Sequence, residues 1–485
     1  MQDFNLDYVA KKSVKGIFAL VSRTFLIQIV GIASSFILTV FLTPSDFGVF
    51  FIVSSLIVFL NYFQDIGLAA SLIQKKDQPT RGELNTIFTL QQILVFLLVV
   101  PMFLLSGYIG SFYKLSPEAM FLYYALLVSF VLSSFRTIPT ILLERELNFN
   151  KLVIPQIIEN LIYNVVLITF SVLGFGVTTF TIAVIARSVV GFVVTYLVKP
   201  WRPGFGFDFA SIKSLMSFGL PFQLNSVLAL IKDDLLTVYI GKVLPLAQVG
   251  YIGFAQKWAF MPLRLVMDNV IKITFPSYSR LQHDKDALRT AIEKSLFLVS
   301  LIIFPAIIFM IFLAEPFITF VPKYQKWLPA VYSLMFFSFN TLFSSISTPL
   351  TNFLNAIGKV KITLYFMVFW TVATWVSTIY LISTMGYNGV AFASFLVSIS
   401  SVLIIIIARR YCVFSVFKSI VKQFIASIVM GVALFLTLPL VTNLIWLFVE
   451  VIFATTFYIF VLYLIAGRDL KKTFKFVYTA IRSKE

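Results

Sequence analysis

Seven positively charged side chains stand inside long apolar segments of this chain, and the chemistry open to such side chains is the binding of anions. They are Arg23, Arg136, Arg187, Lys232, Lys257, Arg264 and Lys272. One cation facing lipid at the centre of a bilayer costs about 3 kcal/mol on a lenient insertion scale, so seven would cost about 20 kcal/mol. That sum exceeds the stability of a typical protein, about 5–15 kcal/mol. We therefore expect these side chains to face a protein interior or a water-filled cavity. A cationic cavity across a membrane in turn predicts an anionic substrate.

The densest group of charges lies in one apolar segment, where Lys257, Arg264, Asp268 and Lys272 are spaced by 7, 4 and 4 residues. At about 3.6 residues per turn, these positions share one face of a helix. Two interpretations remain open. The stripe could form a cavity wall that contacts an anionic substrate, since it keeps surplus positive charge after Asp268 is counted. Alternatively, it could be a salt-bridge ladder, with Asp268 as counter-ion, that docks on another helix.

A second group of charges combines a cation with two carboxylates. Lys232 is followed directly by Asp233 and Asp234. Adjacent residues on a helix point in different directions, so these three charges cannot all take part in one ion pair. One carboxylate could neutralise Lys232. The other could bind Na⁺ or a proton as a coupling ion, because intramembrane carboxylates commonly serve in ion pathways. A purely structural network is the alternative.

The first half of the chain holds the remaining charges of this kind. Asp65 and Glu159 are the candidate counter-ions. The arginines of this half are Arg23, Arg136 and Arg187. Arginine keeps its charge at any relevant pH and presents a fork that suits phosphate oxygens. For each arginine, contact with a phosphate and a structural pair that joins two helices both remain open.

The elements that must position these side chains are apolar segments long enough to cross a bilayer, which takes about 20 residues. Fourteen such segments run over residues 16–42, 46–73, 85–109, 119–141, 152–174, 177–198, 214–240, 246–275, 290–313, 328–356, 361–384, 387–408, 420–440 and 443–466. The composition agrees, because only 12% of the residues are charged, against about 25% in soluble domains. The sequence predicts an all-α polytopic membrane protein of about 14 transmembrane helices.

The distribution of charge predicts the orientation of these helices. The net charge is +17, which in a soluble protein would point to nucleic acid. If the N-terminus is cytoplasmic, 27 lysines and arginines fall on the cytoplasmic side, and only Lys114, Lys242, Lys323 and Lys326 fall on the other. This asymmetry follows the positive-inside rule. We expect both termini in the cytoplasm, contacts with membrane lipids and no nucleic-acid partner.

The two halves of the chain show a weak internal repeat. Leu42 and Gly48 follow the first segment as Leu244 and Gly250 follow the seventh, at a common offset of 202 residues. Six spans per half would let both halves enter the membrane from the same side. Parallel repeats of this kind, related by an axis along the membrane normal, are known in transporters. We therefore expect two six-helix lobes in a parallel pseudo-twofold repeat, plus two C-terminal helices.

This repeat divides the chain into three expected parts. They are an N-lobe over 1–200 (spans 1–6), a C-lobe over 201–410 (spans 7–12), and residues 411–485 with spans 13 and 14 and a basic cytoplasmic tail. Prolines within or near the ends of spans 7 to 10 are Pro221, Pro262, Pro305 and Pro349. Each frees a backbone carbonyl and permits a kink or hinge.

Several classes of enzyme are excluded by what the sequence lacks. There is no G-x-x-x-x-G-K-[ST] phosphate-binding loop, no metal-ligand spacing and no nucleophile elbow. The one cysteine, Cys412, cannot form an intramolecular disulfide, and the one histidine, His283, lies in a charged loop. We expect a transporter rather than an enzyme, with no catalytic residue, metal or cofactor apart from a coupling Na⁺ or proton.

Three motifs in the first third of the chain resemble those of the polysaccharide transporter family, the Wzx-type flippases. Phe41–Gly48 (FLTPSDFG) is similar to its L-x-P-x-D-F-G turn. Phe63–Lys76 (FQDIGLAASLIQKK) is similar to its D-x-G-L-x-x-x-L-I-Q segment. Leu143–Phe149 (LERELNF) is similar to its L-x-R-x-L-x-F loop. The family belongs to the superfamily that also contains lipid II flippases and multidrug and toxin extrusion transporters.

The resemblance implies two lobes around a central cavity. It also implies flipping of an undecaprenyl-pyrophosphate-linked oligosaccharide across the bacterial inner membrane by alternating access, for O-antigen or exopolysaccharide synthesis. The prenyl chain would lie beside spans 13 and 14, and the polymerase and glycosyltransferases of the pathway are candidate partners. Related lipid II flippases use an arginine in span 1 and one in span 8. Arg23 and Arg264 match these by position, although Lys257 competes with Arg264.

Two alternatives stay open. A cation-coupled multidrug exporter of the same fold would need an acidic cavity for its mostly cationic substrates, and the seven intramembrane cations argue against it. A membrane glycan polymerase or ligase would generally carry a large external loop with catalytic residues, and the sequence has none.

Overall fold

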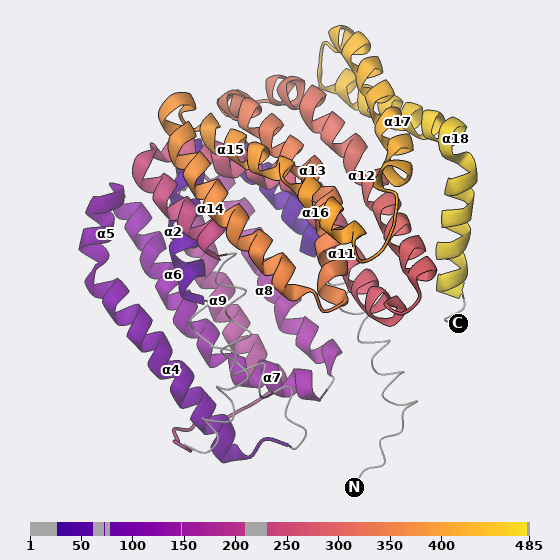
Figure 1. Ribbon diagram of the computed structural model, residues 1–485. Helices are drawn as coiled ribbons and strands as arrows, with labels where there is room; N and C mark the ends of the chain where they lie inside the picture. Colours follow the sequence, from indigo (N-terminus) through magenta and orange to yellow (C-terminus); the bar gives the residue numbers. More distant parts are fainter. Residues whose placement is uncertain (1–26, 62–71, 73–77, 147, 209–229, 483–485) are drawn as a thin grey trace. The chain divides into compact units, whose positions relative to one another are not determined.

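The computed structural model describes residues 27–61, 72, 78–146, 148–208 and 230–482, and every regular element within these ranges is a helix (Figure 1). The chain forms two compact units, Met1–Gly250 and Tyr251–Glu485. The described part thus agrees with the predicted all-α fold. The predicted partition at residues 200 and 410 stays a prediction.

Unit 1 consists of helices joined by short turns. In chain order they are a helix over 27–41, α2 (Pro44–Asn61), α4 (Arg81–Leu104), α5 (Ser106–Tyr113), α6 (Pro117–Phe135), α7 (Thr137–Arg145), α8 (Phe149–Val172), α9 (Thr178–Val198) and a helix over 230–243. The first turn of α11 (Leu246–Leu281) also belongs to this unit. Within it, α9 packs along both α8 and α6, and α6 also packs against α2 and α4.

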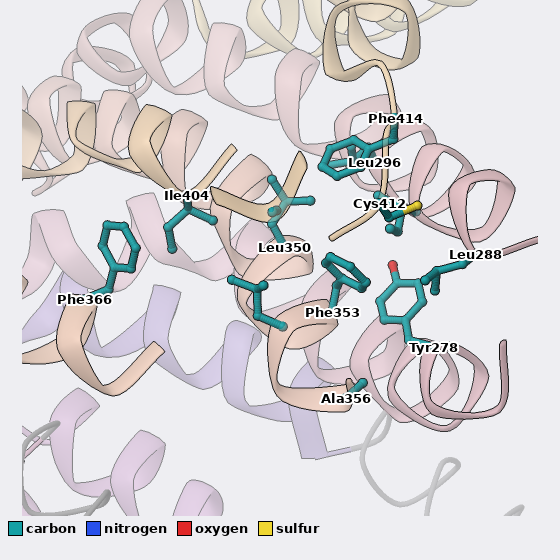
Figure 2. Close-up of a cluster of buried hydrophobic side chains, with 13 residues drawn as sticks. Tyr278, Leu288, Leu296, Leu350, Phe353, Ala356, Phe366, Ile404, Cys412 and Phe414 are labelled. Atoms are coloured by element: carbon teal, nitrogen blue, oxygen red, sulfur yellow. The ribbon is translucent and has the colours of Figure 1, made fainter. Parts of the chain in front are cut away.

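Unit 2 is built around two long helices. Its elements after α11 are α12 (Lys285–Phe320), η1 (Gln325–Ala330), α13 (Val331–Ala356), α14 (Val360–Met385), α15 (Asn388–Ile399), α16 (Ser401–Arg409), α17 (Val416–Thr437), η2 (Leu438–Leu440) and α18 (Leu444–Arg482). α12 packs against α13 and α17, α13 against α15, and α17 against α18. At one end of the unit, Tyr278, Phe353, Cys412 and Phe414 meet in a buried cluster (Figure 2).

The chain is a multi-pass membrane protein. Ten helices of the described part are long and apolar enough to cross a membrane. The other four predicted spans correspond to the shorter helices over 27–41 and 44–61, to the helix over 230–243, and to the charged helix α11. Every predicted span therefore has a helical counterpart, and the count of fourteen stays a prediction.

Among the residues that the structure describes, three predicted spans are interrupted by a break between two α-helices that the apolar pattern did not indicate. The breaks fall at Leu105 between α4 and α5, at Arg136 between α6 and α7, and at Ser400 between α15 and α16. The break at Arg136 has a clear cause. Pro139 has no N–H to offer the carbonyl of Phe135, and the Tyr196 hydroxyl donates to that carbonyl instead, at 2.9 Å.

One of the prolines predicted to free a carbonyl, Pro305, behaves in a similar way in unit 2. Pro305 lies inside α12, so the carbonyl of Leu301 loses its intrahelical partner. The Tyr458 hydroxyl on α18 donates to this carbonyl at 3.0 Å. Pro262 lies inside α11 and Pro349 inside α13. The predicted Pro221 falls outside the described residues.

Candidate anion-binding site

The predicted site residues divide between the two units. Arg23 and Asp65 lie outside the described residues. Unit 1 holds Arg136, Glu159, Arg187, Lys232, Asp233 and Asp234, and unit 2 holds Lys257, Arg264, Asp268 and Lys272. The role of these residues in binding substrate stays a prediction.

Arg136 and Glu159 form a close ion pair at the junction of α6, α7 and α8. Arg136 Nη1 lies 2.7 Å from Glu159 Oε2, and the two side chains are only 19% and 8% exposed. Arg136 Nε also donates to Thr195 Oγ1 of α9 at 3.1 Å. Arg136 therefore has partners on two helices that pack beside it, which matches the structural interpretation of this arginine.

Gly191 of α9 makes room for this pair. A Cβ atom at Gly191 would lie 2.3 Å from Glu159 Oε2 and 2.6 Å from Arg136 Nη1. Both distances are far below van der Waals contact. Any larger residue at this position would push the carboxylate and the guanidinium out of place, so α9 can lie against the ion pair only at a glycine.

Arg187 is placed differently, although it shares the same carboxylate. Its Nη2 lies 3.7 Å from Glu159 Oε1, and its side chain is 45% exposed. The contact is longer than a hydrogen bond. The guanidinium carbon also lies 5.4 Å from the centre of the Tyr163 ring, within the range of a cation–π contact.

These residues together carry one surplus positive charge. Arg136 and Arg187 share the single carboxylate of Glu159, and Arg136 takes the short contact. A guanidinium has five N–H donors, and the contacts of Arg187 with Glu159 (3.7 Å) and with the centre of the Tyr163 ring (5.4 Å) are both longer than a hydrogen bond. Arg187 can therefore offer a fork of donors to an oxyanion while Arg136 stays bound in the fold.

The second charged group of unit 1 also separates into a pair and a remaining carboxylate. Lys232 Nζ lies 3.4 Å from Asp233 Oδ1. Within the described ranges, Asp234 makes no ion pair. The arrangement has the form expected from the sequence, with one carboxylate near Lys232 and one apart from it. Binding of a coupling ion at Asp234 stays a prediction.

The charged stripe of unit 2 lies along α11. Lys257, Arg264, Asp268 and Lys272 are all exposed. Among the residues that the structure describes, no carboxylate oxygen lies within 4.0 Å of a nitrogen of these three cations. The salt-bridge ladder that the sequence left open is therefore not formed there. Binding of an anion by this stripe stays a prediction.

Sequence reasoning missed the residues that support the arginines. Tyr163 follows Glu159 by four residues on α8, and Gly191 and Thr195 follow Arg187 by four and eight on α9. Residues at these spacings share a helix face, so the pattern was available. It was not singled out because a tyrosine, a glycine and a threonine are ordinary residues of a membrane helix.

Comparison with known proteins agrees with the three sequence motifs. The family described as "Polysaccharide biosynthesis protein" matches residues 37–332. The lipopolysaccharide biosynthesis protein WzxC of Escherichia coli (strain K12) is 26% identical over 371 residues, covering 74% of this chain and 73% of its own length. The teichuronic acid biosynthesis protein TuaB of Bacillus subtilis (strain 168) is 24% identical over 397 residues, covering 78% of this chain and 79% of its own length.

Solved structures of transporters share the fold. The lipid II flippase MurJ in an inward closed conformation has a TM-score of 0.77 at 17% identity, covering 94% of this chain and 99% of its own. An inward-facing MATE multidrug resistance transporter has a TM-score of 0.64 at 16% identity, covering 82% of this chain and 98% of its own. The expectation of a transporter rather than an enzyme is confirmed, as is the resemblance that the motifs indicated. The chain belongs to the polysaccharide biosynthesis protein family.

Proposed function

We propose that this chain flips an undecaprenyl-pyrophosphate-linked oligosaccharide repeat unit from the inner to the outer leaflet of the bacterial inner membrane by alternating access. Relatives named for the synthesis of lipopolysaccharide and teichuronic acid support a surface polysaccharide as the end product. A relative named as a succinoglycan biosynthesis transport protein supports transport as the step. The proposal places both termini in the cytoplasm, as the charge distribution indicates.

The observation that carries this proposal is the state of Arg187. It is a half-exposed arginine inside a membrane helix, held over Tyr163 with only a long contact to a carboxylate. Holding a cation there is costly unless an anion compensates it. A diphosphate supplies that anion, and its charge is neutralised at a site where both partners would otherwise be poorly solvated. The planar fork of arginine suits phosphate oxygens better than a lysine does.

The stripe on α11 supplies a second group of cations for the same substrate. Lys257, Arg264 and Lys272 are exposed and have no carboxylate partner among the described residues. They suit a substrate with several negative charges, and the resemblance to lipid II flippases implies the same role for Arg23. The sugar unit needs hydroxyl and amide partners rather than charge, so the cations select for the lipid-linked diphosphate.

The test uses a strain deleted for this chain, in which lipid-linked repeat units are counted on each leaflet. Complete units that accumulate on the cytoplasmic leaflet support the proposal, whereas an unchanged distribution contradicts it. Complementation with Arg187→Ala is expected to lower surface polysaccharide at least about tenfold, and Arg187→Lys to have an intermediate effect. Arg280→Ala, which removes an exposed arginine at the end of α11, is the matched control. Normal polysaccharide with Arg187→Ala at wild-type abundance would remove Arg187 from the site.

A cation-coupled multidrug exporter is the second candidate, because the fold is also that of a MATE transporter and Asp234 has no ion-pair partner among the described residues. The surplus of exposed cations on α11 does not suit cationic drugs. An unchanged pool of lipid-linked units in the deletion strain, together with a raised sensitivity to cationic drugs, would favour this candidate.

A further inference from the structure

The two turns of the internal repeat touch each other through their glycines. A Cβ atom at Gly48 would lie 1.9 Å from the carbonyl oxygen of Leu246, and one at Gly250 would lie 1.9 Å from the carbonyl oxygen of Pro44. These are backbone oxygens, so no side-chain rotation can relieve the overlap. The first turns of α2 and α11 therefore approach so closely that only glycine fits at both positions.

The contact is reciprocal, and its symmetry is that of the sequence repeat. Gly250 is the equivalent of Gly48, and Leu246 is the equivalent of Pro44, at the offset of 202 residues. Gly48 thus faces the carbonyl of Leu246, and Gly250 faces the carbonyl of the equivalent residue, Pro44. Two equivalent contacts of this kind arise where a pseudo-twofold axis passes between two helices of a parallel repeat.

The rest of the first turn of α2 is held rigid for this contact. The Thr43 hydroxyl accepts a hydrogen bond from the Asp46 N–H at 3.2 Å, and the Thr43 N–H donates to Asp46 Oδ2 at 2.8 Å. This reciprocal pair is a capping box, and Pro44 occupies the first helical position, where its missing N–H does no harm. The L-T-P-S-D-F-G turn thus fixes the Pro44 carbonyl that meets Gly250.

Packing at the same end of unit 1 joins α2 to the helix over 230–243. A Cβ atom at Gly241 would lie 2.6 Å from Ile52 Cγ1, and Ile52 is fully buried. Lys242 Nζ donates to the Phe112 carbonyl at 3.2 Å. The glycine contact therefore lies at the end of a packed interface that continues past Ile52, on the face that the charge distribution predicts to be the outer one.

We infer that Gly48 and Gly250 form a latch that holds the two repeats together at the outer face, and that it must open and reclose during transport. This inference rests on the proposed function only in assigning the movement to transport. In a membrane, helices gain little from apolar burial against each other, so close backbone contact at small residues is a main source of their association. Cα–H···O contacts at such crossings add to it. A contact made only of backbone can separate without breaking a buried charge pair.

The test adds one methyl group to the latch and measures how far the interface opens. Gly48→Ala or Gly250→Ala forces the two turns apart by about 1.4 Å, the distance needed for a carbon–oxygen contact of about 3.3 Å. A cysteine introduced by Ile52→Cys reports opening through its reaction with a membrane-impermeant maleimide in vesicles of both orientations. Gly31→Ala is the matched control, because a Cβ atom there would have no neighbour within 4 Å.

We expect each latch variant to raise the labelling rate about tenfold, the effect of about 1.4 kcal/mol of overpacking. The double variant should label at nearly the rate of the faster single variant, because both changes open one contact. Thr43→Ala loosens the same turn without adding volume, so it should raise labelling even where an alanine variant fails to accumulate. Labelling at the wild-type rate in these variants would overturn the latch.

Surface polysaccharide, measured in the same strains, separates the latch from the proposed function. Faster labelling together with reduced polysaccharide supports a latch that transport requires. Faster labelling with normal polysaccharide overturns the link between this contact and transport. The labelling rate does not depend on the identity of the substrate, so a failure of the proposed function in the deletion strain leaves the latch result intact.

Discussion

Replacing Glu159 by glutamine gives the most direct test of how unit 1 balances its buried charges. The Glu159 carboxylate lies 2.7 Å from Arg136 Nη1, and both side chains are largely buried. Leaving one partner of such a pair unpaired costs about 3–5 kcal/mol. Thr195 still accepts a hydrogen bond from Arg136 Nε, so we expect the lower end of this range for Glu159→Gln.

The double variant Arg136→Gln/Glu159→Gln distinguishes the loss of a pair from the loss of a side chain. Removing both charges leaves no uncompensated ion, and such replacements are often close to neutral. We therefore expect the double variant to be more stable than the single variant, and within about 1 kcal/mol of the wild type. This order would not arise if Glu159 mattered only through its volume, because the double variant changes more of the junction.

Thermal unfolding of the purified protein in detergent, followed by fluorescence-detected size exclusion, measures the effect. Glu159→Gln should lower the Tm by on the order of 5 °C. Glu118→Gln is the control, because Glu118 is an exposed carboxylate in the first turn of α6. Two results would refute the reasoning: a Tm for Glu159→Gln equal to that of the wild type, or a double variant no more stable than the single one.

Three further predictions follow from single contacts. Gly191→Ala should lower the Tm about as much as Glu159→Gln, because its Cβ would lie 2.3 Å from the carboxylate, and equal melting of Gly191→Ala and the wild type would contradict the tight junction. Tyr458→Phe should cost about 1–3 kcal/mol by leaving the Leu301 carbonyl without a donor, measured by Tm against Tyr365→Phe at an exposed position. Cys412 should react slowly with a thiol reagent at neutral pH until the protein is denatured. Its side chain is 2% exposed, and burial raises the pKa of its thiol, which reduces the thiolate fraction. Rapid labelling of the folded chain would contradict the place of Cys412 in the cluster of Figure 2.

The sequence predicted the helices well because apolar length is a direct consequence of the bilayer. It predicted their ends less well. α12 extends over Lys285–Phe320 where the apolar pattern indicated 290–313. α18 is kinked at Ala466, whose φ is −129°, so the break falls at the last residue of the predicted span 443–466, and a second helical segment follows to Arg482. Both extensions are polar or amphipathic. A search for apolar length detects only the part of a helix that lies in lipid, so such extensions are missed.

The breaks within spans were missed for a different reason. The break at Arg136, where α6 ends and α7 begins, lies inside one predicted span, 119–141. The cause is Pro139, whose effect appears four residues earlier at the Phe135 carbonyl, and the break is stabilised by the Tyr196 hydroxyl from another helix. The sequence pattern of one segment does not show which side chain of another helix will donate a hydrogen bond to it in the folded protein.

The candidate site shows the same limit. The sequence supplied Arg136, Arg187 and Glu159 as a set without saying which arginine holds the carboxylate closely. The structure separates them, because Arg136 lies at 2.7 Å and Arg187 at 3.7 Å from its oxygens. That choice depends on how α8 and α9 pack, and on a glycine, Gly191, that lets them approach. The types of residue could be predicted, but their pairing could not.

Glycine permits close approach at two contacts of unit 1 that differ in charge. At Gly191 it admits an ion pair against a helix, and at Gly48 and Gly250 it admits one helix against the backbone of another. The two places differ in what separation would cost. Opening the junction at Gly191 would expose a buried pair of charges, which is expensive, whereas opening the contact at Gly48 separates neutral backbone groups. In a transporter that must move at one end and keep its shape elsewhere, neutral backbone contacts suit the part that moves, and buried charge pairs suit the part that stays fixed.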